Sequence, residues 1–456
     1  MEELKVCKFG GSSITTPQDI AKIKQIVKDD PSRRIIVVSA PGKKNPGDTK
    51  VTDMLINLAT VRDQAPIPSI IQRFRDLHPK IADELERDLR QRAGGPITDP
   101  KAYQDSLASF GEEANARLIS GALDFCYVDP EQLFKVTPDF QKARMLPGSA
   151  ELTNRVLTKL LRKPNEILVI PGFYGHTEDG QRATFGRGMS DFTGAFVAAA
   201  VNASLYENFT DQDGVLSANP NVVANPSIID RITYGEMRDL AYTEFGILHS
   251  EAINPVIQAM IPIHIRNTAE YPREGTLIVD DRIHDINRPI VGIAYGKDFC
   301  SFDISGPELN GNLGILADAL NVFRQKGVSV EHVPSGIDDF SVIVNQNDLY
   351  SANQTSDQIG SIKRALYETI KSSGNQDFRR NGGRVDFKDN LGCLVVAGKG
   401  IKRKRELSSE VERELATHGI DVVFSTKGTQ QRSIIYGVNM AQGNKAVNAL
   451  YDKYLR

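Results

Sequence analysis

The sequence contains no tryptophan and only four cysteines in 456 residues. The cysteines stand far apart and form no C-x-x-C pair; they are Cys7, Cys126, Cys300 and Cys393. Isolated thiols in so long a chain exclude a disulfide-built fold and a cysteine-ligated metal cluster. We therefore expect an ordinary apolar core, and we predict no metal site.

Long hydrophobic runs are also absent. No stretch reaches the roughly 18 apolar residues of a membrane-spanning helix, and the opening MEELKVCKFGG lacks the basic and then apolar pattern of a secretion signal. The 55 basic and 58 acidic side chains leave a formal net charge of -3, which gives no electrostatic reason to expect nucleic-acid binding. These absences predict a soluble cytoplasmic protein of about three domains.

The first 60 residues alternate between strand and helix patterns. Apolar residues within 4–9 precede two glycines and two serines, and Thr16 followed by Pro17 is typical of a helix start. Apolar residues then repeat at helical spacing over 20–27. Residues 35–38 form a continuous apolar run, as in strands covered on both faces. This β-α-β order predicts a mainly parallel sheet with right-handed connections.

The same alternation resumes further along the chain. Strands are predicted at 167–170 and 203–209, on either side of a helix that follows Asp191. Residues 61–165 are charge-rich with a helical pattern, which indicates a helical lobe. Ligands of open α/β sheets bind at the carboxyl ends of the strands. The Gly, Ser, Thr and Asp residues that follow these strands therefore mark a candidate ligand site.

An internal repeat occupies the C-terminal part. Residues 327–330 (GVSV) are matched by 419–422 (GIDV) at an offset of 92 (419 − 327), and the following strand patterns share this offset. A helical pattern precedes each copy, over 315–326 and 406–418. Two copies of a strand-helix-strand-strand unit favour two α+β modules over a solenoid. Residues 372–390, rich in Gly, Asn and charge, are predicted to be a mobile linker between them.

Three polar motifs are candidates for chemistry. In 8–13 (KFGGSS), glycine amides at a strand-to-helix turn suit an anion, but the lysine precedes the glycines, unlike a Walker A loop. In 185–191 (FGRGMSD), Arg187 between glycines can grip a carboxylate, whereas Asp191 alone is equally typical of a helix N-cap. Residues 208–214 (NFTDQDG) end in an ordinary turn signal. A purely structural role stays open for each motif taken singly.

Taken together, these motifs resemble the amino acid kinase family, in particular its aspartate kinases. The first matches K-F-G-G-[ST]-S, residues 186–191 resemble G-R-G-G-S-D, and 209–211 resemble [WF]-T-D. The C-terminal repeats are similar to tandem ACT domains. The resemblance covers nearly the whole chain and implies an α/β fold, with a three-layer α/β/α catalytic domain and a mainly parallel sheet. The implied domains are a catalytic domain at 1–288 and two ferredoxin-like ACT domains at 298–375 and 391–456, the second completed by a strand from about 290–297.

The resemblance implies ATP-dependent phosphorylation of the β-carboxylate of L-aspartate to 4-phospho-L-aspartate, the first step toward lysine, threonine and methionine, with Mg²⁺ as cofactor. The implied residues are Lys8 and Asp191 for catalysis, Gly10, Gly11 and Ser12 for phosphate, Ser39, Thr52, Glu112, Arg187 and Ser190 for aspartate, and Thr210, Asp211 and Gly214 for ATP. Arg187 would bind the substrate's α-carboxylate and Glu112 its ammonium group. The accepting carboxylate is ionised at pH 7, so no general base is needed.

Regulation is implied by the ACT pair. The resemblance places feedback inhibition by lysine, threonine or both at Asn312, Gly314, Ile315, Glu331 and Ser335, and it implies a homodimer or homotetramer formed through the ACT domains. The alternative for Gly314 is a glycine that only permits a turn.

Several positions depart from the family pattern. Met189 replaces the usual second glycine of the loop, and Leu216, Asn219, Asn221 and Gly246 differ from residues that many relatives carry near the nucleotide. These departures predict a looser ATP site. Two alternatives stay open: a catalytically silent amino-acid sensor, and a kinase for another acyl substrate such as glutamate, N-acetylglutamate or carbamate.

Overall fold

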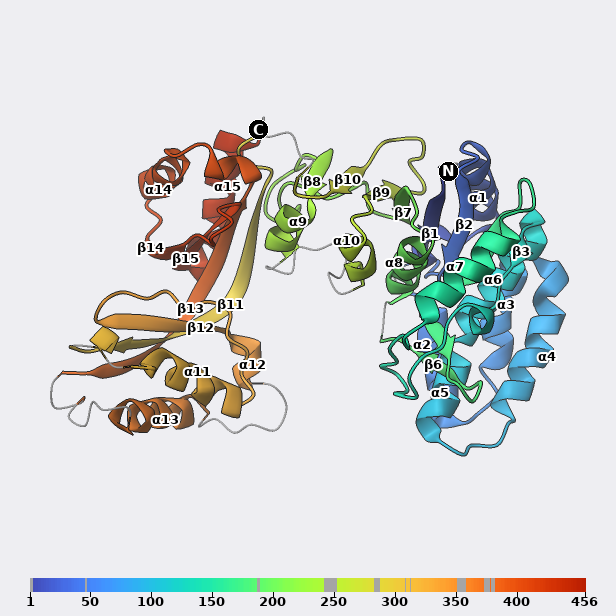
Figure 1. Cartoon of the computed structure of the whole chain (residues 1–456), viewed down its shortest axis with the longest axis horizontal. Coiled ribbons are helices and arrows are strands. Elements are labelled where there is room, and N and C mark those ends of the chain that lie inside the picture. The colour runs from blue at the N-terminus through green and yellow to red at the C-terminus, as the bar shows by residue number, and fades with distance from the viewer. Residues whose placement is uncertain are drawn as a thin grey trace. The chain divides into compact units, whose positions relative to one another are not determined.

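The computed structural model describes residues 3–45, 47–186, 189–241, 252–282, 288–307, 309–311, 313–350, 358–372, 378 and 382–456. The chain divides into two compact units (Figure 1). The first comprises Met1–Val215, Ile228–Tyr234 and Ile247–His284, and the second comprises Leu216–Ser227, Gly235–Gly246 and Asp285–Arg456. No helix within the described ranges is both long and apolar enough to cross a membrane.

The first unit is built on a largely parallel sheet. Its strands follow the order β3-β4-β2-β1-β7-β9-β10-β8, and among the described pairs only β9 and β10 run antiparallel. The strands are β1 Lys5–Phe9, β2 Arg33–Val38, β3 Cys126–Tyr127, β4 Leu168–Pro171, β7 Leu205–Thr210, β8 Arg231–Thr233, β9 Ile263–Asn267 and β10 Thr276–Val279. The α/β class with a mainly parallel sheet is therefore confirmed.

Helices accompany this sheet, and those between residues 61 and 165 form the predicted helical lobe. They are α1 Pro17–Lys28, α2 Val51–Val61, α3 Ile67–Leu77, α4 Ala82–Ala93, α5 Pro100–Ala108, α6 Phe110–Leu123, α7 Ser149–Leu160, α8 Ser190–Ala200 and α10 Asn254–Gln258, with short 3₁₀ turns η1 Gly11–Ser13, η2 Pro79–Ile81 and η3 Pro130–Gln132. A separate hairpin is formed by β5 Tyr174–His176 and β6 Arg182–Thr184. Helix α1 begins as predicted, because the Thr16 side chain accepts from the Asp19 amide at 3.3 Å while the Thr16 amide donates to the Asp19 carboxylate at 2.8 Å.

The centre of the sheet contains a buried charge cluster. Glu207 in β7 accepts two hydrogen bonds from Arg33, at 2.6 and 2.8 Å, and lies 3.4 Å from Arg266. The rings of Phe9 and Phe209 stack beside it with centroids 4.7 Å apart. Because the two arginines lower the pKa of Glu207 despite its burial, the carboxylate remains ionised and paired. The charged groups join β2, β7 and β9, and the stacked rings join β1 to β7.

The second unit contains an antiparallel sheet in the order β12-β11-β13-β15-β14. Its strands are β11 Gly292–Ser305, β12 Asp339–Asn345, β13 Arg384–Ala397, β14 Val422–Thr426 and β15 Ser433–Asn439. Its helices are α9 Tyr234–Ala241 (from residue 235 onward), α11 Ile315–Gln325, α12 Gln346–Tyr350, α13 Gln358–Ser372, α14 Leu407–Thr417 and α15 Gly443–Tyr454, with 3₁₀ turns η4 Leu309–Gly311, η5 Lys399–Lys402 and η6 Met440–Gln442. Helices α11 and α13 pack together on one part of this sheet and α14 and α15 on another (Figure 1), which makes two apolar cores.

The strands β11 and β13 belong to both halves of this sheet. Residues 292–296 of β11 pair with 393–397 of β13, and 301–305 pair with 384–388. One end of the ladder continues through β15 to β14, and the other continues to β12. The α+β modules therefore share two long strands instead of forming separate sheets.

Two details of the repeat differ from the sequence prediction. The strand pattern after α11 gives only two isolated bridges, His332–Ile343 and Ser335–Phe340, whereas the second copy forms β14. Pro334 lies between those bridges and has no N–H to donate, which prevents a continuous ladder. The predicted mobile linker was too long, because residues 384–390 form the first half of β13.

Candidate functional site

A cavity of about 590 Å³ lies in the first unit, next to the ends of β1, β2 and β7. It is lined by Lys8, Gly10, Gly11, Ser12, Ser39, Ala40, Pro41, Gly42, Lys43, Lys50, Thr52, Asp53, Glu112, Phe173, Ser190, Asp191, Thr210 and Asp211. We call it the cleft. Among the described residues, all those predicted for catalysis, phosphate, aspartate and ATP line it except Gly214.

Lys8 and Asp191 form an ion pair in the cleft. The Lys8 Nζ lies 2.7 Å from the Asp191 Oδ1, and the side-chain amide of Asn208 donates to the same oxygen at 2.9 Å. Lys8 and Asn208 are direct partners in the parallel pairing of β1 with β7. Met189 is the N-cap of α8, and Asp191 lies in the first turn. The carboxylate of Asp191 therefore positions the Lys8 ammonium and is not the helix cap that the sequence left open.

The glycine turn after β1 contacts a second loop. The Gly42 amide donates to the Gly11 carbonyl at 2.8 Å, and the Gly10 amide donates to the Phe209 carbonyl at 3.0 Å. A Cβ on Gly42 would lie 2.4 Å from the Gly11 oxygen, and a Cβ on Gly11 would lie 2.7 Å from the Ala40 oxygen. Only glycine permits so close an approach of two backbones. The turn and the 39–42 segment thus form one rigid backbone surface at the cleft.

Glu112 is a buried carboxylate on α6. One of its oxygens accepts from the Ala40 amide, while Oε2 has no hydrogen-bond partner among the described residues. Glu112 as a whole is only 4 % exposed. Burial raises the pKa of Glu112 to about 8, because no cation compensates for the lost solvation of the charged form. The site therefore offers a polar oxygen that favours a cationic partner.

The remaining substrate-side residues come from three elements. Ser39 follows β2, and its carbonyl accepts from the Asn115 side chain at 2.6 Å. Thr52 lies in the first turn of α2. Ser190 opens α8, and a Cβ on Gly172 would lie 2.8 Å from the Ser190 Cβ. These contacts keep the three hydroxyl-bearing residues close to the cleft wall.

Thr210 and Asp211 follow β7 on the nucleotide side. The Thr210 hydroxyl donates to the Asp211 carboxylate at 3.1 Å, and the Asn267 side chain donates to the Asp211 carbonyl at 3.3 Å. Gly214 does not line the cleft. It has φ +146, and a Cβ there would lie 2.6 Å from the Thr276 hydroxyl, so its glycine serves a tight turn.

Sequence reasoning missed the loop between β2 and α2. Lys43 and Lys50 of this loop, and Asp53 in the first turn of α2, line the cleft together with the predicted residues. Residues 43–50, KKNPGDTK, carry three lysines after a strand end that already marks the ligand edge. That concentration of positive charge was the available signal for a polyanionic ligand.

Other predicted positions lie elsewhere. Arg187 and Gly246 are outside the described residues. Met189 has φ -87, so this loop does not need a glycine-only conformation there. The remaining departures, Leu216, Asn219 and Asn221, belong to the second unit.

The predicted regulatory residues within the described ranges lie at the start of α11 and on the segment opposite β12. Gly314 is the N-cap of α11 with φ +80, and Ile315 is the first helical residue. The Glu331 amide donates to the Ile343 carbonyl at 2.9 Å, and Ser335 forms a bridge with Phe340. Asn312 is outside the described residues. The left-handed conformation of Gly314 agrees with a turn that favours glycine.

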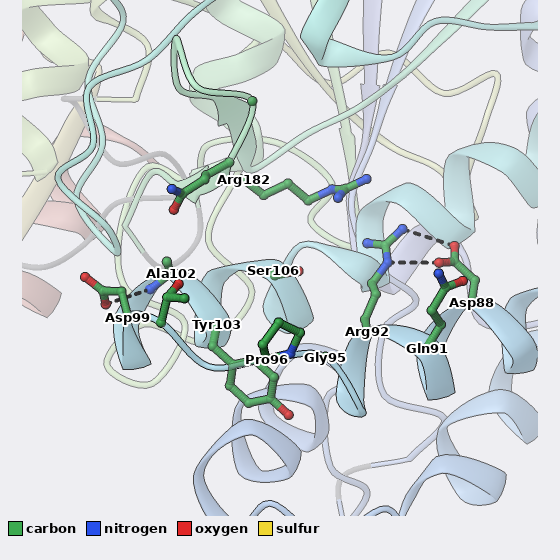
Figure 2. A pocket seen from close by; sticks show the side chains of 13 residues that line it. Asp88, Gln91, Arg92, Gly95, Pro96, Asp99, Ala102, Tyr103, Ser106 and Arg182 are labelled. Carbon is green, nitrogen blue, oxygen red and sulfur yellow. Dashed lines mark hydrogen bonds and ion pairs between the residues drawn. The ribbon is translucent and has the colours of Figure 1, made fainter.

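A second cavity, of about 600 Å³, lies in the helical lobe (Figure 2). It is lined mainly by polar residues of α4, α5 and the turn before β6, and it contains none of the predicted site residues. Arg92 on its wall bonds to both Asp88 oxygens at 3.0 Å and to Glu113 at 2.8 Å. Arg92 is thus paired with carboxylates of the protein itself, whereas Glu112 in the cleft has no cation beside it in the described part of the chain.

Comparison with known proteins agrees with this geometry. Residues 3–267 match the model of the amino acid kinase family. Aspartokinase 3 of Bacillus subtilis is 34% identical over 469 residues, covering 99% of this chain and 98% of the relative. The aspartate kinase structure of Clostridium acetobutylicum has a TM-score of 0.82 at 29% identity, over 99% of this chain and 100% of that one. Aspartokinase III of E. coli, solved in complex with lysine and aspartate, shares the fold with a TM-score of 0.73 at 20% identity, over 100% of both chains.

These matches first define a class, enzymes that transfer a phosphoryl group from ATP to a small acid. The chain belongs to the amino acid kinase family and, within it, to the aspartate kinases. The predicted ATP-dependent phosphorylation of aspartate with allosteric regulation is thereby confirmed.

Proposed function

We propose that the cleft transfers the γ-phosphoryl group of MgATP to the β-carboxylate of L-aspartate, giving 4-phospho-L-aspartate. The observation that carries this assignment is the joint presence of Lys8, the glycine turn and buried Glu112 in one cavity. These groups match a phosphoryl group, a nucleotide phosphate chain and a substrate ammonium group, respectively. The accepting carboxylate is already ionised, so positioning and electrostatics are sufficient.

Lys8 is the catalytic cation in this proposal. Its ammonium group is only 2.7 Å from Asp191, and β1 and α8 hold both side chains in place. A preorganised cation stabilises negative charge on the transferring phosphoryl oxygens without rearrangement during the reaction. Asp191 orients the ammonium group and keeps the Lys8 side chain from turning toward other anions.

Glu112 recognises the ammonium group of aspartate. Its Oε2 lacks a partner among the described residues, and a bound ammonium group would supply both a hydrogen bond and a positive charge. An N-acetylated amino acid cannot do so, which disfavours N-acetylglutamate as substrate. Ser39, Thr52 and Ser190 would orient the substrate, and Arg187 would bind its α-carboxylate by family resemblance.

The nucleotide phosphates would lie along Gly10, Gly11 and Ser12, with Lys43 and Lys50 adding positive charge. Thr210 and Asp211 would contact the remainder of ATP. Mg²⁺ prefers oxygen ligands, and the carboxylates of Asp191 and Asp211 line the cleft and fit this preference. Bound Mg²⁺ neutralises charge on the phosphate oxygens.

The second unit would sense the feedback amino acid. The predicted ligand site combines the start of α11 with Glu331 and Ser335, and the ligand would be lysine, threonine or both. The exposed apolar residues Leu313 and Ile337, at 97% and 74%, lie near these positions in the chain and fit burial between subunits of a homodimer or homotetramer. The cytoplasmic location stays a prediction.

Trapping of the acyl phosphate with hydroxylamine tests the reaction and the substrate. Purified chain and MgATP are combined with aspartate, glutamate or N-acetylglutamate, with and without added lysine and threonine. Hydroxamate from aspartate alone, lost in Lys8→Met, is the expected result, and suppression by one amino acid would identify the feedback ligand. Absence of hydroxamate from every substrate in folded protein would instead favour the silent sensor.

A further inference from the structure

Three potential metal ligands gather beside the β5–β6 hairpin, away from the residues that line the cleft. Asp129 caps the 3₁₀ turn η3, Glu131 lies within that turn, and His176 ends β5. Their ligand atoms all lie within 4.8 Å of one another. An imidazole nitrogen and two carboxylate oxygens are a donor set that suits Zn²⁺ and similar divalent transition metals.

His176 provides the decisive observation. Its side chain is only 3% exposed, and its Nδ1 has no hydrogen-bond partner among the described residues. This Nδ1 faces the Asp129 Oδ1 at 3.8 Å, too far for a hydrogen bond. Two ligands bound to one ion at about 2.0–2.1 Å each are separated by at most about 4.2 Å. The observed separation is therefore compatible with an ion between the two atoms.

The surrounding groups keep both ligands in a suitable state. Burial and the positive charges of Arg182 and Lys135 lower the pKa of His176, against the opposing effect of Asp129 and Glu131. Asp129 is oriented by the Glu131 amide at 2.9 Å and the Tyr127 hydroxyl at 3.1 Å. Such contacts fix the direction of a metal-binding carboxylate.

The two nearby cations do not block the cluster. Arg182 is engaged elsewhere, since its Nη2 lies 3.2 Å from the Glu113 carboxylate, and its side chain lines the cavity in Figure 2. Lys135 lies 3.7 Å from the Glu131 Oε1, beyond hydrogen-bond distance. Glu131 is exposed, so it can rotate toward an ion.

We propose that Asp129, Glu131 and His176 bind one divalent transition metal ion, of the Zn²⁺ class, at a site separate from the Mg²⁺ of the reaction. The sequence predicted no such site, because its ligands are 45 or more residues apart between the turn and the hairpin (176 − 131). The ion would tie η3 to β5. In the chain, β6 is followed by the segment that leads to Ser190. A metal ion bound here would therefore stabilise the hairpin that precedes this substrate-binding residue.

Metal titration of the full chain tests this site. Chelator-treated wild type, His176→Gln and Glu131→Gln are titrated with Zn²⁺ in excess Mg²⁺ by calorimetry. The control is His264→Gln, because His264 also lies 3.2 Å from a carboxylate, that of Glu274, but belongs to no three-ligand group among the described residues. We expect wild type and the control to bind one equivalent that both site variants lose.

A second measurement separates binding at this site from binding elsewhere. With ¹⁵N-labelled histidine, Zn²⁺ should shift the His176 Nδ1 resonance first among the seven histidines, and it should raise the melting temperature of wild type but not of Glu131→Gln. Since Glu131 is exposed, this variant keeps the test valid even if His176→Gln fails to fold. Equal Zn²⁺ binding by wild type and Glu131→Gln, with no shift at His176, would overturn the proposal.

Discussion

Replacement of Glu112 by glutamine tests whether ionisation of this buried side chain destabilises the folded protein. Glu112 is buried, one of its oxygens lacks a partner among the described residues, and its pKa is raised to about 8. Glutamine has nearly the same shape but cannot ionise. We expect Glu112→Gln to remove a pH-dependent cost of folding and to abolish aspartate binding.

The magnitude follows from the pKa difference. The unfolded chain releases the Glu112 proton near pH 4.5, while the folded chain retains it to about pH 8. Retention of the Glu112 proton in the folded state therefore contributes in full to the free energy of unfolding below pH 4.5. This contribution is lost as the pH rises to about 8. At about 1.36 kcal/mol per pH unit, a window of 3.5 units (8 − 4.5) corresponds to a loss on the order of 4–5 kcal/mol.

The assay compares unfolding of the two proteins at several pH values. The buried amide of glutamine costs roughly 1–3 kcal/mol at every pH, so the informative quantity is the change between pH 5 and pH 8.5. Over that range the variant should gain on the order of 4 kcal/mol relative to wild type, or roughly 8 °C in melting temperature for a domain of this size.

The neighbouring Glu113 provides a matched control. Burial alone would raise the pKa of Glu113. A hydrogen bond from Arg92 and the positive charges of Arg92 and Arg182 outweigh this effect and lower the pKa. Glu113→Gln should therefore destabilise the protein at neutral pH, the opposite sign. A difference between Glu112→Gln and wild type that is the same at pH 5 and pH 8.5 would refute the reasoning. So would wild-type affinity for aspartate in the variant.

Other substitutions probe the remaining parts of the molecule. Lys8→Met should lower kcat by roughly 10²–10³-fold with little change in the KM for aspartate, whereas Lys50→Met, on the exposed loop, should mainly raise the KM for ATP; steady-state kinetics distinguish the two. Gly42→Ala places a Cβ 2.4 Å from the Gly11 oxygen, so calorimetry should show a loss of about 1–3 kcal/mol, and unchanged stability would contradict the close approach. Gly314→Asp should abolish amino-acid inhibition while kinase activity persists, and dose–response curves that match wild type would remove Gly314 from the regulatory site.

Much of the fold could be predicted because its signals are local. The Thr16–Pro17 helix start and the apolar run at 35–38 depend on neighbouring residues only, and both elements form as expected. The missing strand near Pro334 and the long strand through 384–390 were not predicted. Both depend on pairing with distant segments, which a local pattern does not contain.

The candidate site divides in the same way. Lys8 and Asp191 follow from motifs at element ends, and the structure brings them within 2.7 Å. Lys43 and Lys50 have no periodicity and lie on an irregular loop, so only their position after a strand end could have indicated them. The sequence around His176 gives no sign of a ligand site, because only the folded hairpin brings this residue beside Asp129.

The sharing of β11 and β13 determines whether the two C-terminal modules can be separated from each other. The earlier half of β11 completes the later module, while its later half completes the earlier one. A break anywhere between the modules would leave an exposed strand edge on the remaining part, and open edges invite aggregation. For the same reason, neither module is a sensible fragment to express alone.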